Sequence, residues 1–283
     1  MLVINKLAIA TFPRPILLLY IQLTFTSVAV SVANKCGLIK LTPWEGGATL
    51  QKFWLVPLTF MISIFCNIKI LSYTNVGTFI ALRSSTPLVL AILDKKFAGR
   101  TTPPRQAWVS IVGVLLSSML YIQIEGASVS TDSFSWIIIW YATFCFDQMY
   151  TKHVVDTVVM TTWDRVWYTN TVPLVILFPL IFIVEDDIVI NSDELRDTGG
   201  VVVASCVGGL MMSTTSYWLR GEVSATTFAV VGNACKFITV LLNYVMWDKH
   251  ASRRGVGALM MGIAFSMLYR PNKLIDKKKA NSV

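Results

Sequence analysis

Charged residues are scarce in this chain. Only 14% of its 283 residues are Asp, Glu, Lys or Arg, whereas a water-soluble domain carries about 25%. Histidine occurs twice and cysteine five times, without a C-x-x-C pair, so neither a disulfide framework nor a zinc site is expected. We interpret the cysteines as small apolar packing residues. No separate polar domain and no cleavable signal peptide are expected.

Apolar residues make up 54% of the chain. They come in runs of roughly 17 to 22 residues, the length that crosses a hydrocarbon core about 30 Å thick. The sequence therefore predicts an all-α polytopic membrane protein whose spans pack with short connections. Small residues such as Gly208, Gly209, Gly257 and Gly262 are expected to allow close helix approach. The nine candidate spans are residues 16–33, 53–71, 76–93, 107–124, 134–150, 166–184, 199–219, 226–247 and 255–269.

The distribution of basic residues predicts the orientation. Loops after the first, third, fifth and seventh spans, together with the C-terminal tail, are rich in lysine and arginine, and the loop that contains residues 185–197 is acidic. The richer set should be cytosolic, which places the C-terminus in the cytosol. Nine spans would put the N-terminus on the lumenal side, where Lys6 and Arg14 fit poorly, so the orientation of the N-terminus stays open. Because the basic residues flank apolar spans, the net charge of +8 does not indicate nucleic-acid binding.

Lys236 lies in the middle of the apolar span 226–247. A lone cation at that depth costs roughly 2.5 to 3.5 kcal/mol on insertion scales. Gly232 and Lys236 are four residues apart and share one helix face, with Asn233 adjacent. The glycine would admit a ligand, the amide would supply hydrogen bonds and the ammonium would supply charge. This face is predicted to bind an anion.

Arg83 is a second intramembrane cation, and Pro87 should break the backbone hydrogen-bond ladder beside it, which could make a hinge or a local cavity. A weak internal echo links the two spans, because Thr78-Phe79 precedes Arg83 as Thr227-Phe228 precedes Lys236. Two such helices in corresponding halves fit a transporter of inverted repeats. Two interpretations stay open for Arg83, namely ligand contact and a purely structural pairing.

A third candidate feature opens the span 166–184. Trp167 and Asn170 are three residues apart and share a face, which offers an aromatic ring beside a planar amide. A nucleobase needs such a stacking surface and a group that reads its edge. Aromatic residues at a membrane boundary are also common interfacial anchors, so both interpretations stay open.

Several strings in the chain match one transporter family. The longest runs from Ser224 through Gly232 and Lys236 to Ser252. The others are Asn34-Lys35, Phe65-Cys66-Asn67-Ile68-Lys69, Thr78-Phe79, Leu82-Arg83-Ser84-Ser85-Thr86-Pro87-Leu88, Met149-Tyr150-Thr151-Lys152-His153 and Tyr168-Thr169-Asn170. On these residues the chain resembles the nucleotide-sugar transporters of the drug/metabolite transporter superfamily, specifically the plant-type Golgi GDP-sugar branch.

The resemblance implies a single transmembrane domain of ten helices in two inverted repeats, here residues 1–150 and 151–283. It implies exchange of a cytosolic nucleotide sugar for a lumenal nucleoside monophosphate, without a cofactor. In GDP-sugar members a Phe/Leu-Tyr-Asn-Asn motif recognises guanine, and Tyr168 and Asn170 match it. A Gly-x-x-Asn-Lys motif holds the sugar and diphosphate, and Gly232 and Lys236 match that one.

Two substitutions depart from these motifs. Thr169 replaces the first asparagine of the guanine motif and so removes one amide that would read the base edge. Cys235 replaces the asparagine before the lysine, while Asn233 stands two positions earlier, about 200° around the helix. Guanine selectivity and the identity of the sugar therefore stay open.

A larger departure lies between Lys35 and Lys52, where the family carries a further apolar helix. Here residues 36–51 form a short stretch that contains Pro43, Gly46 and Gly47. We therefore expect the first repeat to lack its second helix, as a skipped segment or a shortened isoform would.

These observations predict a Golgi antiporter that imports a GDP-sugar, with GDP-fucose as the first candidate, in exchange for GMP. Lys236 is expected to bind the diphosphate, with Arg83 as a further contact. Asn233 or nearby hydroxyls are expected to bind the sugar. Trp167, Tyr168 and Asn170 are expected to bind the base.

Two alternatives remain. One is an organophosphate exchanger like the triose-phosphate translocators, which Val231-Gly232-Asn233 and Lys236 echo, although Phe237 stands where those proteins typically place an arginine. The other is a transport-deficient shortened protein that acts through association. An enzyme is not expected, because the aspartates and histidines lack a recognisable catalytic spacing. The expected partners are the nucleotide sugar, the nucleoside monophosphate and the bilayer, with a homodimer left open.

Overall fold

The computed structural model describes residues 4, 7–8, 12, 14–42, 53–73, 76–98, 103–126, 133–184, 192–246 and 252–270. Within these residues the long elements are all helices, and each of them coincides with one predicted span. Several extend beyond the apolar run by one or two turns. The all-α prediction is confirmed. The helices are α2 (Pro15–Lys35), α4 (Leu55–Tyr73), α5 (Val76–Ala98), α6 (Arg105–Glu125), α7 (Ser133–Thr157), α8 (Thr162–Val184), α9 (Ser192–Glu222), α10 (Ala225–Met246) and α11 (Arg253–Leu268).

Four helices in the described part of the chain are long and apolar enough to cross a bilayer. They include Pro15–Lys35, Arg105–Ile124, Thr162–Ile183 and Thr198–Glu222. Each has the 18 or more residues that span a hydrocarbon core. Crossing helices therefore occur near the N-terminus, in the middle and in the second half of the chain, as a polytopic membrane protein requires.

The chain divides into two compact units. Unit 1 holds Met1–Met61 and Val154–Gly221, and unit 2 holds Ile62–His153 and Glu222–Val283. Each unit therefore draws helices from both halves of the sequence. This division by contact does not test the predicted inverted repeats, whose boundary near residue 150 stays a prediction.

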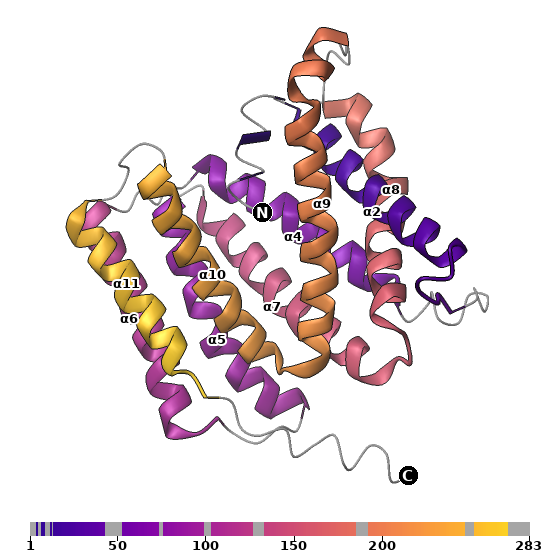
Figure 1. Cartoon of the computed structure of the whole chain (residues 1–283). Helices are drawn as coiled ribbons and strands as arrows, with labels where there is room; N and C mark the ends of the chain where they lie inside the picture. Colours follow the sequence, from indigo (N-terminus) through magenta and orange to yellow (C-terminus); the bar gives the residue numbers. More distant parts are fainter. Residues whose placement is uncertain are drawn as a thin grey trace, which may run out of the picture. The chain divides into compact units, whose positions relative to one another are not determined.

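In unit 1, α2 packs along α8, and the two helices lie side by side in Figure 1. Helix α2 ends at Lys35 in a turn closed by Gly37, whose φ of +72° favours glycine. The N–H of Leu38 donates to the carbonyl of Ala33 at 3.0 Å, which satisfies one of the carbonyls that the helix end leaves without a partner. On another face, buried Leu18 packs with Val202 and Cys206 of α9.

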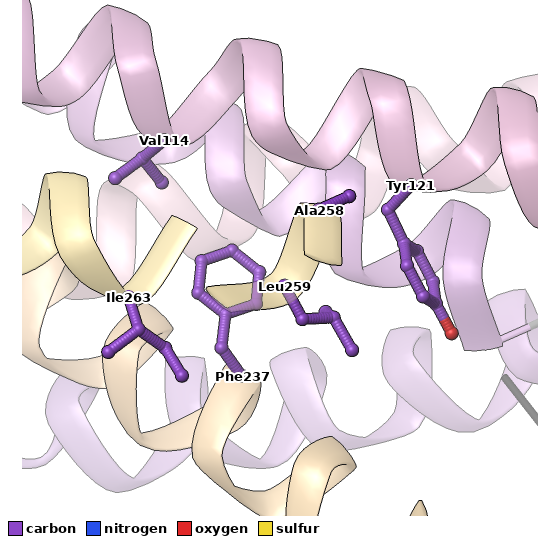
Figure 2. Packing of buried hydrophobic residues seen from close by; sticks show 6 residues of the cluster. All are labelled: Val114, Tyr121, Phe237, Ala258, Leu259 and Ile263. Atoms are coloured by element: carbon purple, nitrogen blue, oxygen red, sulfur yellow. The ribbon is translucent and has the colours of Figure 1, made fainter. Parts of the chain in front are cut away.

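In unit 2, α11 packs along α6, and α10 packs against both α5 and α11. Figure 1 shows α6 and α11 side by side. Their shared core contains Val114 and Tyr121 of α6, Phe237 of α10, and Leu259 with Ile263 of α11. Figure 2 shows the Phe237 ring enclosed by this cluster, and only 1% of its surface is exposed.

Glycine permits this packing at two positions. A Cβ added to Gly262 would lie 2.7 Å from the Phe237 ring, and one added to Gly113 would overlap the Phe265 ring. The expectation of close helix approach is thus confirmed at Gly262. It is not met at Gly257, where a Cβ would find no described atom within 4 Å.

The segment that should hold a further helix is described only in part. Residues 36–42 form a turn followed by irregular chain, and residues 43–52 lie outside the described residues. The predicted loss of that helix is therefore not tested. The packing role predicted for cysteine fits Cys66, Cys145 and Cys206, which are buried, whereas Cys36 and Cys235 are exposed.

Candidate functional site

Helix α5 continues through Pro87 without interruption, but the predicted break in its backbone hydrogen-bond ladder leaves the main-chain carbonyl of Arg83 without a helical donor. Proline has no N–H, so it cannot donate the helical hydrogen bond to the residue four positions earlier. The Arg83 carbonyl instead accepts from the Thr86 hydroxyl at 2.6 Å and from Nδ2 of Asn233 at 3.4 Å. Asn233 belongs to α10, so the freed carbonyl becomes a link between α5 and α10.

The Arg83 side chain lies over an aromatic ring. Its Cζ atom is 4.8 Å from the ring centroid of Phe144 in α7, within the range of a cation–π interaction. The Phe144 ring is buried and stacks on that of Trp140, with 5.2 Å between centroids and an interplanar angle of 19°. The charged group of Arg83 thus has a defined place in unit 2.

Lys236 is half-buried on α10. Within the described residues, its ammonium makes no hydrogen bond and no ion pair, and its electrostatic neighbours are the Arg83 guanidinium and the Cys235 thiol. The guanidinium repels the ammonium. Unit 2 therefore concentrates positive charge at a helix contact inside the predicted membrane region, which is the electrostatic requirement of an anion site.

Gly232 stands one turn before Lys236. A Cβ at this position would meet no described atom within 4 Å, so the glycine is not needed for helix packing as Gly262 is. Asn233 is buried, with 3% of its surface exposed, and uses its Nδ2 on the Arg83 carbonyl. The predicted cluster of Arg83, Gly232, Asn233 and Lys236 is thus assembled in one unit, and its role in binding stays a prediction.

The N-terminal turn of α10 is fixed by a buried carboxylate that sequence reasoning did not single out. Oδ2 of Asp94, near the end of α5, accepts from the hydroxyl of Thr226 at 2.7 Å and from its N–H at 3.3 Å. The N–H of Thr227 donates to the Ser224 hydroxyl at 3.1 Å. These bonds satisfy N–H groups that a helix start leaves without partners. They hold the helix that carries Lys236.

The base-binding candidates lie on α8 in unit 1. The indole N–H of Trp167 donates to the Ser31 hydroxyl of α2 at 3.0 Å, and one turn on, the Thr171 hydroxyl donates to Ser27 at 3.0 Å. This ladder joins α2 and α8. It favours the structural interpretation of Trp167, whose ring also meets that of Tyr168 in a T-shaped contact with 5.1 Å between centroids.

Tyr168 is buried, and its ring lies 5.8 Å from that of Phe53. Asn170 is also buried, and its Nδ2 donates to the Val166 carbonyl of its own helix at 2.7 Å. No described residue donates to Oδ1 of Asn170. Among the described residues, Oδ1 of Asn170 thus stays available as an acceptor, which suits a ligand that presents an N–H.

Thr169, the substituted position of the guanine motif, has a defined partner. Its hydroxyl and that of Tyr217 in α9 are 2.6 Å apart, and both side chains are buried. At the N-terminus of α8, the carboxylate of Asp164 accepts from the N–H of Thr161 at 2.9 Å and from the hydroxyl of Thr42 at 2.7 Å. These hydrogen bonds hold the first turns of α8, which carry the base-binding candidates.

Comparison with known proteins identifies relatives along nearly the whole chain. The Triose-phosphate Transporter family matches residues 1–269. GDP-fucose transporter 1 of Arabidopsis thaliana is 33% identical over 285 residues, which cover 97% of this chain and 82% of the relative. GDP-mannose transporter GONST3 of Arabidopsis thaliana is 31% identical over 290 residues, which cover 99% and 76% respectively.

A protein of known crystal structure shares the fold. Its TM-score is 0.68 at 13% sequence identity, over 93% of this chain and 90% of that chain. The predicted resemblance to plant-type GDP-sugar transporters is confirmed by the two Arabidopsis relatives, and these relatives are transporters rather than enzymes. The protein is a polytopic membrane protein that belongs to the Triose-phosphate Transporter family.

Proposed function

We propose that this protein is a GDP-sugar antiporter of the Golgi membrane, which imports GDP-fucose into the lumen in exchange for GMP. The names of the relatives at 33% and 31% identity, GDP-fucose and GDP-mannose transporters, support the substrate class. The distribution of lysine and arginine supports a cytosolic C-terminus.

The environment of Lys236 carries the proposal. An intramembrane cation costs roughly 2.5 to 3.5 kcal/mol on insertion scales, and here the described neighbours of the ammonium include a second cation and no carboxylate within ion-pair distance. A ligand with two adjacent negative charges offsets both the desolvation and the repulsion. The pyrophosphate of a GDP-sugar is such a ligand.

The side of α10 that carries Lys236 is also sterically suited to a ligand. The open space beside Gly232 lets a ligand approach the helix backbone. Asn233 keeps Oδ1 without a described donor while its Nδ2 holds α5. That oxygen is the group we assign to a sugar hydroxyl. On α8, Tyr168 and Trp167 are assigned to the base, and Oδ1 of Asn170 is assigned to the N–H donors of guanine.

Exchange requires the site to release both ligands. We propose alternating access by two inverted repeats, residues 1–150 and 151–283, in which GDP-sugar and GMP stabilise the same conformations in turn. Because a fixed charge that exceeded the ligand charge would trap the substrate, moderate affinity is expected.

The alternative of an organophosphate exchanger is supported by membership of the Triose-phosphate Transporter family, but the surroundings of Phe237 argue against it. The Phe237 ring is enclosed in the core of α6, α10 and α11, where 1% of its surface is exposed. Position 237 thus points into packed apolar side chains, so a phosphate-binding arginine there would bury its charge. This favours a ligand whose second cationic contact comes from another residue, and we assign that contact to Arg83, which acts electrostatically on Lys236.

The test is exchange by the purified protein in liposomes preloaded with GMP or UMP. GDP-fucose, GDP-mannose, UDP-sugars and triose phosphate are offered in turn. We expect GDP-fucose uptake that depends on internal GMP. Uptake of triose phosphate alone would favour the organophosphate exchanger, and a folded protein without any exchange would favour the transport-deficient alternative.

A further inference from the structure

We infer that Phe144 is a positioning residue of the transport site, which holds the Arg83 guanidinium in place for the phosphate groups of the substrate through a cation–π interaction. The inference rests on the proposed function and extends it to α7, a helix on which no binding residue was predicted. Its basis is the 4.8 Å between Cζ of Arg83 and the ring centroid of Phe144. This distance places the charged head of the arginine, and not only its aliphatic stem, over the ring.

The ring is itself held in a fixed position. Trp140, Tyr141 and Phe144 form an aromatic shelf on α7: Phe144 stacks on Trp140 at 5.2 Å, and Trp140 meets Tyr141 edge-on at 6.0 Å. Trp140 is completely buried. A shelf packed in this way has few alternative rotamers, so it defines the place of a cation above it.

The shelf also contacts α5 through a hydrogen bond between Tyr141 and Ser85. The Tyr141 hydroxyl and the Ser85 hydroxyl are 3.0 Å apart, and Ser85 also donates to the Leu82 carbonyl at 2.6 Å. Arg83 is thereby fixed at three places: its guanidinium on Phe144, its carbonyl by Asn233, and its helix by the Ser85 contact. The shelf therefore keeps the cation aligned.

An aromatic ring suits the role of positioning Arg83 better than a carboxylate would. A carboxylate partner would neutralise the guanidinium and compete with the phosphate of the substrate. An aromatic face attracts the cation through its quadrupole without adding a negative charge. The contact with Phe144 therefore adds no negative charge that would offset the charges of Arg83 and Lys236 toward a diphosphate.

The experiment measures KM and maximal rate of GDP-fucose uptake in GMP-loaded liposomes for Phe144→Leu and Phe144→Tyr. Leucine removes the π face, and we expect KM to rise roughly five- to tenfold, the ratio that corresponds to a partly desolvated cation–π contact. Tyrosine keeps the face, so KM should stay within about twofold of the unmodified protein. Phe146→Leu is the matched control, because Phe146 is exposed on the same helix and stacks on Tyr150 instead.

A role through Arg83 is separated from simple packing by two further measurements. In an Arg83→Gln background, Phe144→Leu should cause no additional rise in KM. Stepwise fluorination of the Phe144 ring keeps its shape and weakens its quadrupole, so KM should rise with each fluorine. This series also decides the question if Phe144→Leu fails to fold.

The outcomes distinguish the inference from the proposed function. If Arg83→Gln impairs uptake while the fluorinated rings leave KM unchanged, or if Phe144→Leu is equally harmful in both backgrounds, the positioning role is overturned and the proposed function stands. If Lys236→Ala and Arg83→Gln both leave uptake unchanged, the proposed site itself is refuted.

Discussion

The amide of Asn233 donates to the main-chain carbonyl of Arg83, which Pro87 leaves without its helical donor. The predicted sugar-binding asparagine is therefore also a structural link from α10 to the carbonyl that Pro87 leaves free in α5. The Thr86 hydroxyl shares the same carbonyl at 2.6 Å. Pro87 thus contributes to the contact between the helices that carry the two candidate cations, because it leaves free the acceptor that Asn233 uses.

Replacing Pro87 with alanine should stabilise the protein and impair transport. Alanine restores the N–H that the helix ladder needs, and a proline in a helix interior costs about 3 kcal/mol relative to alanine. The restored bond competes with Asn233 for the Arg83 carbonyl, so KM for GDP-fucose should rise. Thermal unfolding in detergent and uptake in liposomes measure the two effects.

Pro179→Ala is the control for this variant, since Pro179 lies inside α8 and its side chain is exposed. It should give a comparable gain in thermal stability with little change in KM. Unchanged uptake by Pro87→Ala would show that the missing backbone hydrogen bond at Pro87 has no part in transport.

Replacing Lys236 with methionine should abolish uptake and raise thermal stability. Methionine keeps much of the side-chain volume and removes an intramembrane charge that costs roughly 2.5 to 3.5 kcal/mol on insertion scales. The ligand-free protein should therefore unfold at a higher temperature, and it should no longer be stabilised by added GMP. Lys95→Met, at an exposed position near the end of α5, should change neither property. A destabilised Lys236→Met protein would instead assign the lysine a structural role.

The sequence was sufficient to predict the helices, because runs of apolar residues of membrane length have few other structures open to them. It also identified Lys236 and Arg83, since a charge in an apolar run is conspicuous by itself. Phe144 and Asp94 were missed for the opposite reason. An aromatic residue in an aromatic-rich span and an acid at a helix end are common, and only their contacts with Arg83 and Thr226 distinguish them. A proline four residues after Arg83 was the one signal that pointed to the freed carbonyl.

Cys235→Asn should increase selectivity for GDP-sugars over UDP-sugars. The substitution restores the residue that the resemblance places before the lysine, and Cys235 is exposed, so asparagine fits without repacking. The ratio of kcat/KM for GDP-fucose to that for a UDP-sugar, measured in the same liposomes, should rise. Cys36→Asn, exposed just beyond α2, serves as the control. An unchanged ratio would count against the match between Lys236 and the family motif.

Gly262→Ala should destabilise unit 2 through its contact with Phe237. The added methyl group would lie 2.7 Å from the ring, which is enclosed on its other sides by the core of Figure 2. Overpacking of this kind costs typically 1 to 3 kcal/mol, so thermal unfolding should occur several degrees lower. Gly257→Ala is the matched control on the same helix, because its methyl group meets no described atom within 4 Å and alanine favours the helix by about 1 kcal/mol.

The same variant also tests how α10 is held. Phe237 adjoins Lys236, so a ring displaced by Gly262→Ala should shift the neighbouring ammonium and raise KM for GDP-fucose. Adding Phe237→Leu shortens the side chain and relieves the overlap. The double variant should therefore regain much of the lost stability, and a Gly262→Ala protein as stable as Gly257→Ala would contradict the packing of α11 against α10.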